Sequence, residues 1–165
     1  WLLDPEVGGG RIIGEACHFI DFLTFLVGEN PIEVSTQGLP DQGKYREDNV
    51  VMNFNFPDGS IGVVSYLANG DKSYSKEYLE VFSSGRIAVS NDWRKLELVS
   101  KGRRKGKRHW LSQDKGHKDA WLAFQEAVKS KKAPPIPYEH LLGVSKASFA
   151  AVESLRSGES IKIRI

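Results

Sequence analysis

Residues near the start of the chain combine side chains that can transfer protons with a spacing that gathers them on one side of a helix. At about 100° of turn per residue, positions 11, 14, 18 and 21 fall within roughly 80° of one another. These positions hold Arg11, Gly14, His18 and Asp21, and Glu15 lies beside them. An imidazole titrates near neutral pH, so it can exchange a proton with a substrate hydroxyl. The spacing therefore indicates His18 as a candidate catalytic acid–base, with Asp21 one turn further on to orient its ring.

Each of these residues also has a plainer interpretation. A lone histidine on a helix is more often structural or solvent-facing than catalytic. Asp21 has the alternative role of a solvated carboxylate, and Arg11 that of a surface charge rather than a ligand for a substrate carboxylate or phosphate. Spacing alone leaves these alternatives open.

The helix that positions these residues is predicted by the apolar side chains on its opposite arc. They are Ile12, Ile13, Ala16, Phe19, Ile20, Leu23, Leu26 and Val27. Such an arc is typical of a helix that packs on a core, here over residues 11–27, and Gly28 with Pro31 beyond it are the usual stop signals. The three glycines at 8–10 let the chain turn sharply into this helix. They are not a dinucleotide-binding fingerprint, because no buried strand precedes them.

The order of residues in this stretch resembles that of a known family. It is similar to the opening of the C-terminal domain of the Gfo/Idh/MocA oxidoreductases. That opening has three glycines, three residues, a position that is usually Asp, three more residues, a histidine, two residues and an aspartate. This is the glucose-fructose oxidoreductase and inositol dehydrogenase family, and the resemblance runs along the whole chain. The form Gly-Glu-Ala-Cys-His-Phe-Ile-Asp is most similar to a subgroup in which this module follows a zinc-type alcohol dehydrogenase-like region.

The resemblance implies roles for individual residues. In that family the acid four residues before the histidine holds the substrate, the histidine is the proton-transfer partner, and a lysine in a preceding nucleotide-binding domain completes the set. His18 matches the histidine, whereas Gly14 stands at the acid position, which departs from the usual alcohol-oxidation triad. Glu15 is the neighbouring carboxylate that could substitute, although it points about 100° away from Gly14. His117 precedes a late helix in a segment that the family brings near the substrate, and the plainer interpretation is a polar residue at a helix start.

The resemblance also implies a fold and a function for residues 1–165 as a single domain. The fold is α+β, an open, mainly antiparallel β-sheet with helices on one face, as in dihydrodipicolinate-reductase-like C-terminal domains. The function is substrate binding and oligomerisation in an NAD(P)-dependent oxidoreductase that acts on the hydroxyl of a sugar, nucleotide sugar or polyol. NAD or NADP would be bound mainly by an N-terminal domain that this chain lacks, so the chain alone would be inactive. The alternative is a non-catalytic dimerisation module of a fused dehydrogenase, with Gly14 as the sign of lost chemistry.

The rest of the sequence predicts hairpins followed by late helices. Short alternating runs separated by Gly, Pro, Asn and Asp are typical of consecutive antiparallel strands. The predicted strands cover 32–37, 48–56 paired with 61–68, 77–83 paired with 85–90, 95–100 paired with 109–112, and 161–165, and the predicted helices cover 118–131 and 138–157.

The strands at 48–56 and 61–68 carry apolar residues on both alternating faces. Met52 and Phe54 alternate with Val51, and Val63 alternates with Val64. A sheet that is apolar on both sides needs cover on both sides. We therefore expect one face to pack against the helices and the other against another subunit or domain, giving a homodimer or homotetramer.

Composition narrows the class of protein. With 40% hydrophobic and 27% charged residues, the 165-residue chain is an ordinary globular domain, which excludes a disordered or collagen-like chain. The net charge of +2 gives no argument for nucleic acid, and no apolar window is long enough to span a membrane. One cysteine, Cys17, is compatible with a reducing, cytoplasmic setting. The chain begins at Trp1 without an initiator Met, so we expect a piece of a longer protein.

A run of cations at 101–108 is the sharpest charge feature. Its glycines, Gly102 and Gly106, favour a solvated hairpin tip over a phosphate-binding patch, and only Trp110 offers an aromatic ring for stacking on a base. The spacing of His, Cys and acids gives no zinc pattern, because Cys17 and His18 are adjacent. We therefore expect neither a nucleic-acid partner nor a metal.

Overall fold

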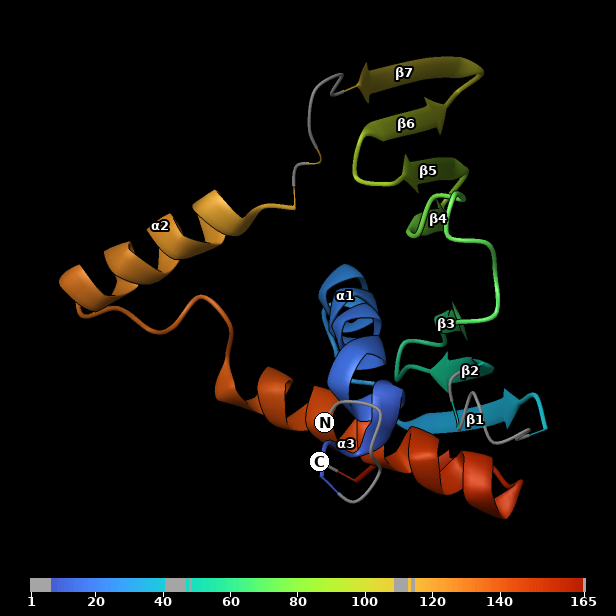
Figure 1. The fold of residues 1–165 in the computed structure, drawn as a ribbon. Coiled ribbons are helices and arrows are strands. Elements are labelled where there is room, and N and C mark those ends of the chain that lie inside the picture. Colours follow the sequence, from blue (N-terminus) through green and yellow to red (C-terminus); the bar gives the residue numbers. More distant parts are fainter. Residues whose placement is uncertain (1–6, 41–46, 48, 109–112, 114, 165) are drawn as a thin grey trace. The chain divides into compact units, whose positions relative to one another are not determined.

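The computed structural model describes residues 7–40, 47, 49–108, 113 and 115–164. The chain divides into two compact units, one made of residues 1–69 and 136–165 and the other of residues 70–135 (Figure 1). Among the described residues each unit has a four-stranded sheet, and every pairing between those strands is antiparallel. The predicted class, a mainly antiparallel α+β fold, is confirmed, with the strands divided between two sheets.

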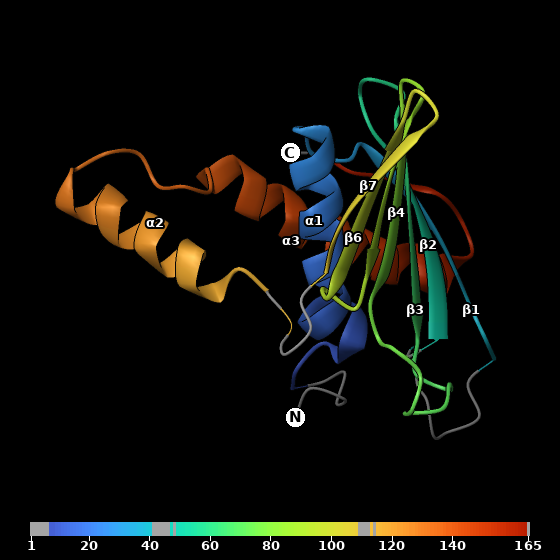
Figure 2. The ribbon, with the colours of Figure 1, turned by 90° about the horizontal axis from the view of Figure 1, so that it is seen from above.

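The first unit places helices on one face of its sheet, as Figure 2 shows for α1 and α3 beside β1, β2 and β3. The strand order is β3-β2-β1-β8. The bounds are η1 Ile12–Ala16, α1 Cys17–Val27, β1 Glu33–Gly38, β2 Asn49–Asn55, β3 Ile61–Leu67, α3 Tyr138–Ser157 and β8 Ile161–Lys162.

The core of this unit lies between the helices and that sheet face. Alternate residues of β2 point into it, and Val50, Met52 and Phe54 are at most 1% exposed. The helices contribute Ile12 and Ile20 from the N-terminal segment and small residues such as Ala147 from α3. Burying a large apolar side chain contributes about 1.5–3 kcal/mol, so this layer supplies most of the driving force for folding the first unit.

Two glycines mark how the predicted long helices end. Gly28 closes α1 with φ 88°, and Gly158 closes α3 with φ 76°. Glycine adopts this left-handed conformation more readily than residues with a Cβ atom, which is why it follows helices so often. Both helix ends were predicted from the sequence, and both are confirmed.

The opposite face of the first sheet is apolar and exposed. Val51, Ile61, Val63 and Leu67 are all at least 36% exposed, whereas their neighbours along each strand are buried or half-buried. The prediction that β2 and β3 carry two apolar faces is therefore confirmed.

The second unit consists of a β-meander followed by a helix. Its bounds are β4 Tyr78–Ser83, β5 Arg86–Asn91, β6 Lys95–Ser100, β7 Arg103–Arg108 and α2 His117–Lys129. No described residue between 70 and 135 is buried, and Trp121 and Phe124 of α2 stack on each other with ring centroids 5.9 Å apart while both remain exposed.

The last hairpin differs from its prediction. Strand β6 pairs with Arg103–Arg108, the basic run itself, and the predicted partner at 109–112 lies outside the described residues. Lys101 and Gly102, with φ 49° and 68°, close the hairpin in two residues, as the tightest hairpin turns require. The run looked like a loop because it lacks apolar residues, but cations are common on the edge strand of a sheet, where they discourage unwanted strand pairing.

Candidate functional site

The segment that carries the candidate residues is not a uniform α-helix. Ile12–Ala16 forms a π-helical turn, in which the Cys17 amide donates to the Ile12 carbonyl, and α1 begins only at Cys17. A π turn is wider than an α turn, so the regular 100° spacing does not apply before His18. The predicted angular spacing of Arg11 and Gly14 relative to His18 and Asp21, which assumed a regular α-helix from residue 11, is corrected for this reason.

The π turn directs Glu15 toward the sheet. Its carboxylate accepts a hydrogen bond from the phenol of Tyr66 on β3. Partial burial of the ring, together with this bond to Glu15, raises the pKa of Tyr66 to about 12, while interaction with Arg11 acts in the opposite direction. Arg11, Glu15 and Tyr66 therefore form one polar cluster, in which Glu15 is already engaged by a protein donor.

His18 and Asp21 line a pocket between α1 and α3, which we call the α1–α3 pocket. Its volume is about 320 Å³, and it is also lined by side chains from the first three turns of α3 and by Ile136, which precedes that helix. The wall from α3 is largely apolar, with Leu141 and Phe149, whereas His18 and Asp21 make the wall from α1 polar. Neither Arg11 nor Glu15 lines this pocket.

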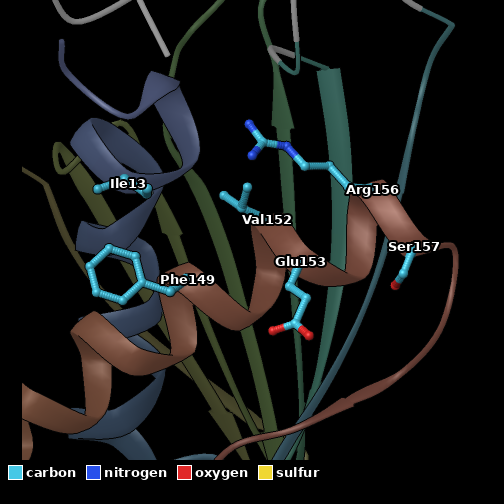
Figure 3. A pocket seen from close by; sticks show the side chains of 6 residues that line it. All are labelled: Ile13, Phe149, Val152, Glu153, Arg156 and Ser157. Atoms are coloured by element: carbon cyan, nitrogen blue, oxygen red, sulfur yellow. The ribbon is translucent and has the colours of Figure 1, made fainter. Parts of the chain in front are cut away.

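A second hollow adjoins this pocket and shares Ile13 and Phe149 with it. Figure 3 shows Ile13 and Phe149 facing each other between the N-terminal helical segment and α3, with Glu153 and Arg156 extending to different sides of α3. The guanidinium of Arg156 donates to both carboxylate oxygens of Glu47, at 2.9 and 3.1 Å. This hollow offers an apolar surface, and its arginine is already paired.

The partner of Asp21 is a residue that the sequence did not indicate. The Nε2 atom of His140 lies 2.8 Å from Oδ1 of Asp21. Because an ionised carboxylate only accepts hydrogen bonds, Nε2 carries the proton and donates it. The two residues are 119 positions apart, and no local pattern links them. Asp21 thus contacts His140 of α3 and not the ring of His18.

Cys17 lies in the pocket wall as a protonated thiol. Burial raises the pKa of Cys17, and the backbone amide of His18 opposes that effect only in part. A raised thiol pKa disfavours nucleophilic chemistry. No three His, Cys, Asp or Glu side chains gather as a metal site in the part of the chain that the structure describes.

His117 is the first residue of α2 in the second unit, and its side chain is exposed. Across the described ranges, no helix is long and apolar enough to cross a membrane.

Comparison with known proteins identifies the family. The profile of the GFO/IDH/MocA C-terminal domain matches residues 1–88, which is more than half of the chain. The chain therefore belongs to the GFO/IDH/MocA oxidoreductase family, as a C-terminal domain. A comparison with curated protein sequences finds no match.

Solved structures share the fold at low sequence identity. A levoglucosan dehydrogenase in its apo form is 17% identical with a TM-score of 0.79, and covers 99% of this chain and 54% of its own. A putative oxidoreductase from Thermotoga maritima is 12% identical with a TM-score of 0.78, over 98% of this chain and 50% of its own. An aldose-aldose oxidoreductase from Caulobacter crescentus, complexed with glycerol, is 19% identical with a TM-score of 0.68, over 98% and 50%. This chain spans about half the length of these proteins.

Proposed function

We propose that this chain is the substrate-binding and oligomerisation domain of an NAD(P)-dependent oxidoreductase that acts on a hydroxyl of a sugar, nucleotide sugar or polyol. The observation that carries the proposal is the placement of His18 and Asp21 on the polar wall of the α1–α3 pocket. Neighbours of the same fold include a levoglucosan dehydrogenase and a structure described as a putative myo-inositol dehydrogenase.

In this proposal His18 exchanges the proton of the reacting hydroxyl. Its side chain is exposed at the pocket, as a group that meets a substrate must be. Asp21 accepts a hydrogen bond from a second hydroxyl. Arg11 and Glu15, which lie outside this pocket beside Tyr66, and His117, the first residue of α2, remain proposed substrate contacts of the full-length enzyme.

The described residues do not form a dinucleotide-binding turn. Such a turn is glycine-rich and lies between a buried strand and a helix. Gly9 and Gly10, with φ 74° and 81°, lead into the π turn, and no described strand precedes them. We therefore assign NAD or NADP to a preceding nucleotide-binding domain, and this chain supplies substrate contacts and proton exchange in a cytoplasmic enzyme.

Oligomerisation is assigned to the exposed face of the first sheet. Val51, Ile61, Val63 and Leu67 form an apolar surface that a second subunit would cover in a homodimer or homotetramer. The same surface, together with Gly14 in place of the usual acid, also suits the second candidate, a non-catalytic dimerisation module.

Turnover by the full-length protein that contains this domain decides between these candidates. It would be measured with NAD(H) and NADP(H) across a panel of polyols, sugars and nucleotide sugars. We expect His18→Ala to lower kcat by roughly 10²-fold or more, because general acid–base groups contribute about that much. Phe25→Ala is the matched control, since this ring is 70% exposed on the same helix.

Two results would overturn the assignment. An active protein that is unaffected by His18→Ala would place the chemistry elsewhere. Absence of turnover in a protein that still dimerises through this domain would favour the non-catalytic module.

A further inference from the structure

His140 lies behind the carboxylate of Asp21 rather than in the α1–α3 pocket. Asp21 lines that pocket, whereas His140 does not. The Asp21 side chain is 44% exposed and the His140 side chain only 21%. The imidazole therefore contacts the pocket only through the carboxylate that it holds, at 2.8 Å.

Asp21 has a competing partner on its own helix. His18 is three residues earlier, and side chains at this separation are neighbours on a helix surface. Yet Oδ1 of Asp21 bonds to His140, and the ring of His18 makes no hydrogen bond or ion pair among the residues that the structure describes. In this arrangement the carboxylate of Asp21 bonds to α3 rather than to the imidazole that precedes it on its own helix.

The turn that carries His140 is itself fixed. Asn30 donates from Nδ2 to the Glu139 carbonyl at 3.1 Å, and the His140 amide donates to the Pro137 carbonyl at 3.1 Å. Asn30 can approach α3 this closely because residue 143 is glycine, where a Cβ would lie 2.2 Å from the Asn30 side chain. His140 therefore presents its ring from a held backbone, as preorganisation of a neighbouring group requires.

We propose that His140 is a positioning residue, which holds Asp21 away from His18. Held in this way, Asp21 keeps one carboxylate oxygen for a substrate hydroxyl, and the ring of His18 stays available for proton exchange. The inference rests on the proposed function, since it assigns a task to the Asp21 carboxylate within that site.

The pairing is tested first, in this chain, without any substrate. Asp21→Ala, His140→Ala and the double variant form a cycle measured by urea unfolding. We expect the two changes to be coupled by about a factor of ten in the unfolding equilibrium constant, which corresponds to ~1.4 kcal/mol. Additive effects would show that the bond is not formed in solution and would overturn the proposal.

The positioning role is tested next, by steady-state kinetics of the full-length protein. We expect His140→Ala to raise KM about tenfold, because a ground-state contact is misplaced, and also to lower kcat, because the released carboxylate of Asp21 can then bond to the ring of His18. His140→Gln should restore most of the affinity, since its amide can donate to Asp21. Tyr138→Phe, on the same turn and 69% exposed, is the control and should match the wild type.

The outcomes separate this inference from the function on which it rests. If the protein turns over and responds to His18→Ala, but KM is unaffected by His140→Ala, the pair is only a structural link and the proposal is wrong. The proposal is equally wrong if His140→Gln behaves like His140→Ala. If nothing turns over, the proposed function fails and the positioning role fails with it, while the unfolding cycle still reports on the bond itself.

Discussion

The two units of this chain have sheets of the same size and different interiors. In the part of the chain that the structure describes, each sheet has four antiparallel strands. In the first unit, Phe54, Met52 and Ile20 are fully buried between the sheet and its helices. In the second unit no described side chain is buried, and Phe82 on β4 is 68% exposed.

This difference shows that strand pairing and core formation are separate contributions to stability. Backbone hydrogen bonds of a ladder contribute little net free energy, because the unfolded chain makes similar bonds to water. Burial of apolar surface stabilises the folded state more strongly. We therefore expect the first unit to resist unfolding by itself and the second to open locally at lower free energy.

The largest expected effect comes from removing an aromatic ring in each unit. Phe54→Ala should destabilise the chain by about 3–5 kcal/mol, because it leaves a cavity in the core. Phe82→Ala should cost less than about 1 kcal/mol, since its ring is already hydrated. Urea unfolding of both variants measures this, and equal losses would mean that Phe82 has a covered site in solution.

Adding one methyl group to a glycine should destabilise the first unit but not the second. A Cβ at Gly143 would lie 2.2 Å from the side chain of Asn30, which donates a hydrogen bond to the Glu139 carbonyl. A Cβ at Gly106 would meet no atom closer than the Leu96 carbonyl oxygen, at 3.4 Å. Overpacking lowers the free energy of unfolding by about 1–3 kcal/mol, whereas the higher helix propensity of alanine over glycine raises it by roughly 1 kcal/mol. We expect a net loss on the order of 1 kcal/mol for Gly143→Ala and a neutral or slightly stabilising effect for Gly106→Ala.

Urea unfolding would check both glycine variants, by comparing the midpoint concentrations at a common m-value. A Gly143→Ala variant as stable as the wild type would show that Asn30 moves aside freely, and that the first turn of α3 is not held as tightly as its contacts indicate.

The smallest expected effect concerns two tyrosines that each donate to a glutamate. Burial is the main cause that raises the pKa of Tyr66 from 10.0 to about 12, whereas the bond to Glu80, of 2.6 Å, is the main cause that raises the pKa of the exposed Tyr78. A raised phenol pKa means that the contribution of Tyr66 to stability is complete below pH 10.0 and is lost as the pH rises through about 12. Tyr66→Phe should lack that alkaline loss.

Ultraviolet titration would distinguish the two rings. Tyr66→Phe should remove the absorbance change near pH 12, and added salt should move the midpoint of Tyr78 more than that of Tyr66, because screening acts on exposed groups. If salt moves the titration midpoints of both tyrosines equally, the two rings are equally exposed to solvent, and the two units do not differ in burial at these positions.

Local sequence signals predicted most elements of both units. Gly28 and Gly158 ended their helices as expected, and the turn from Pro57 to Ser60 joins β2 and β3 where the alternation changes. The basic strand was missed because its pairing with β6 is specified by a two-residue turn and not by apolar alternation. The π turn was missed because the residues that form it would fit an α-helix equally well, so no local sequence pattern distinguishes the two kinds of turn.

By itself the sequence determined the class of fold, the helix that carries His18 and Asp21, and the two apolar faces of β2 and β3. These follow from periodicity and from glycine and proline, which act over a few residues. Only the tertiary structure decided that Glu15 contacts Tyr66 and that Asp21 contacts His140. Such pairs join positions 51 and 119 residues apart, and their geometry depends on how whole helices and strands pack.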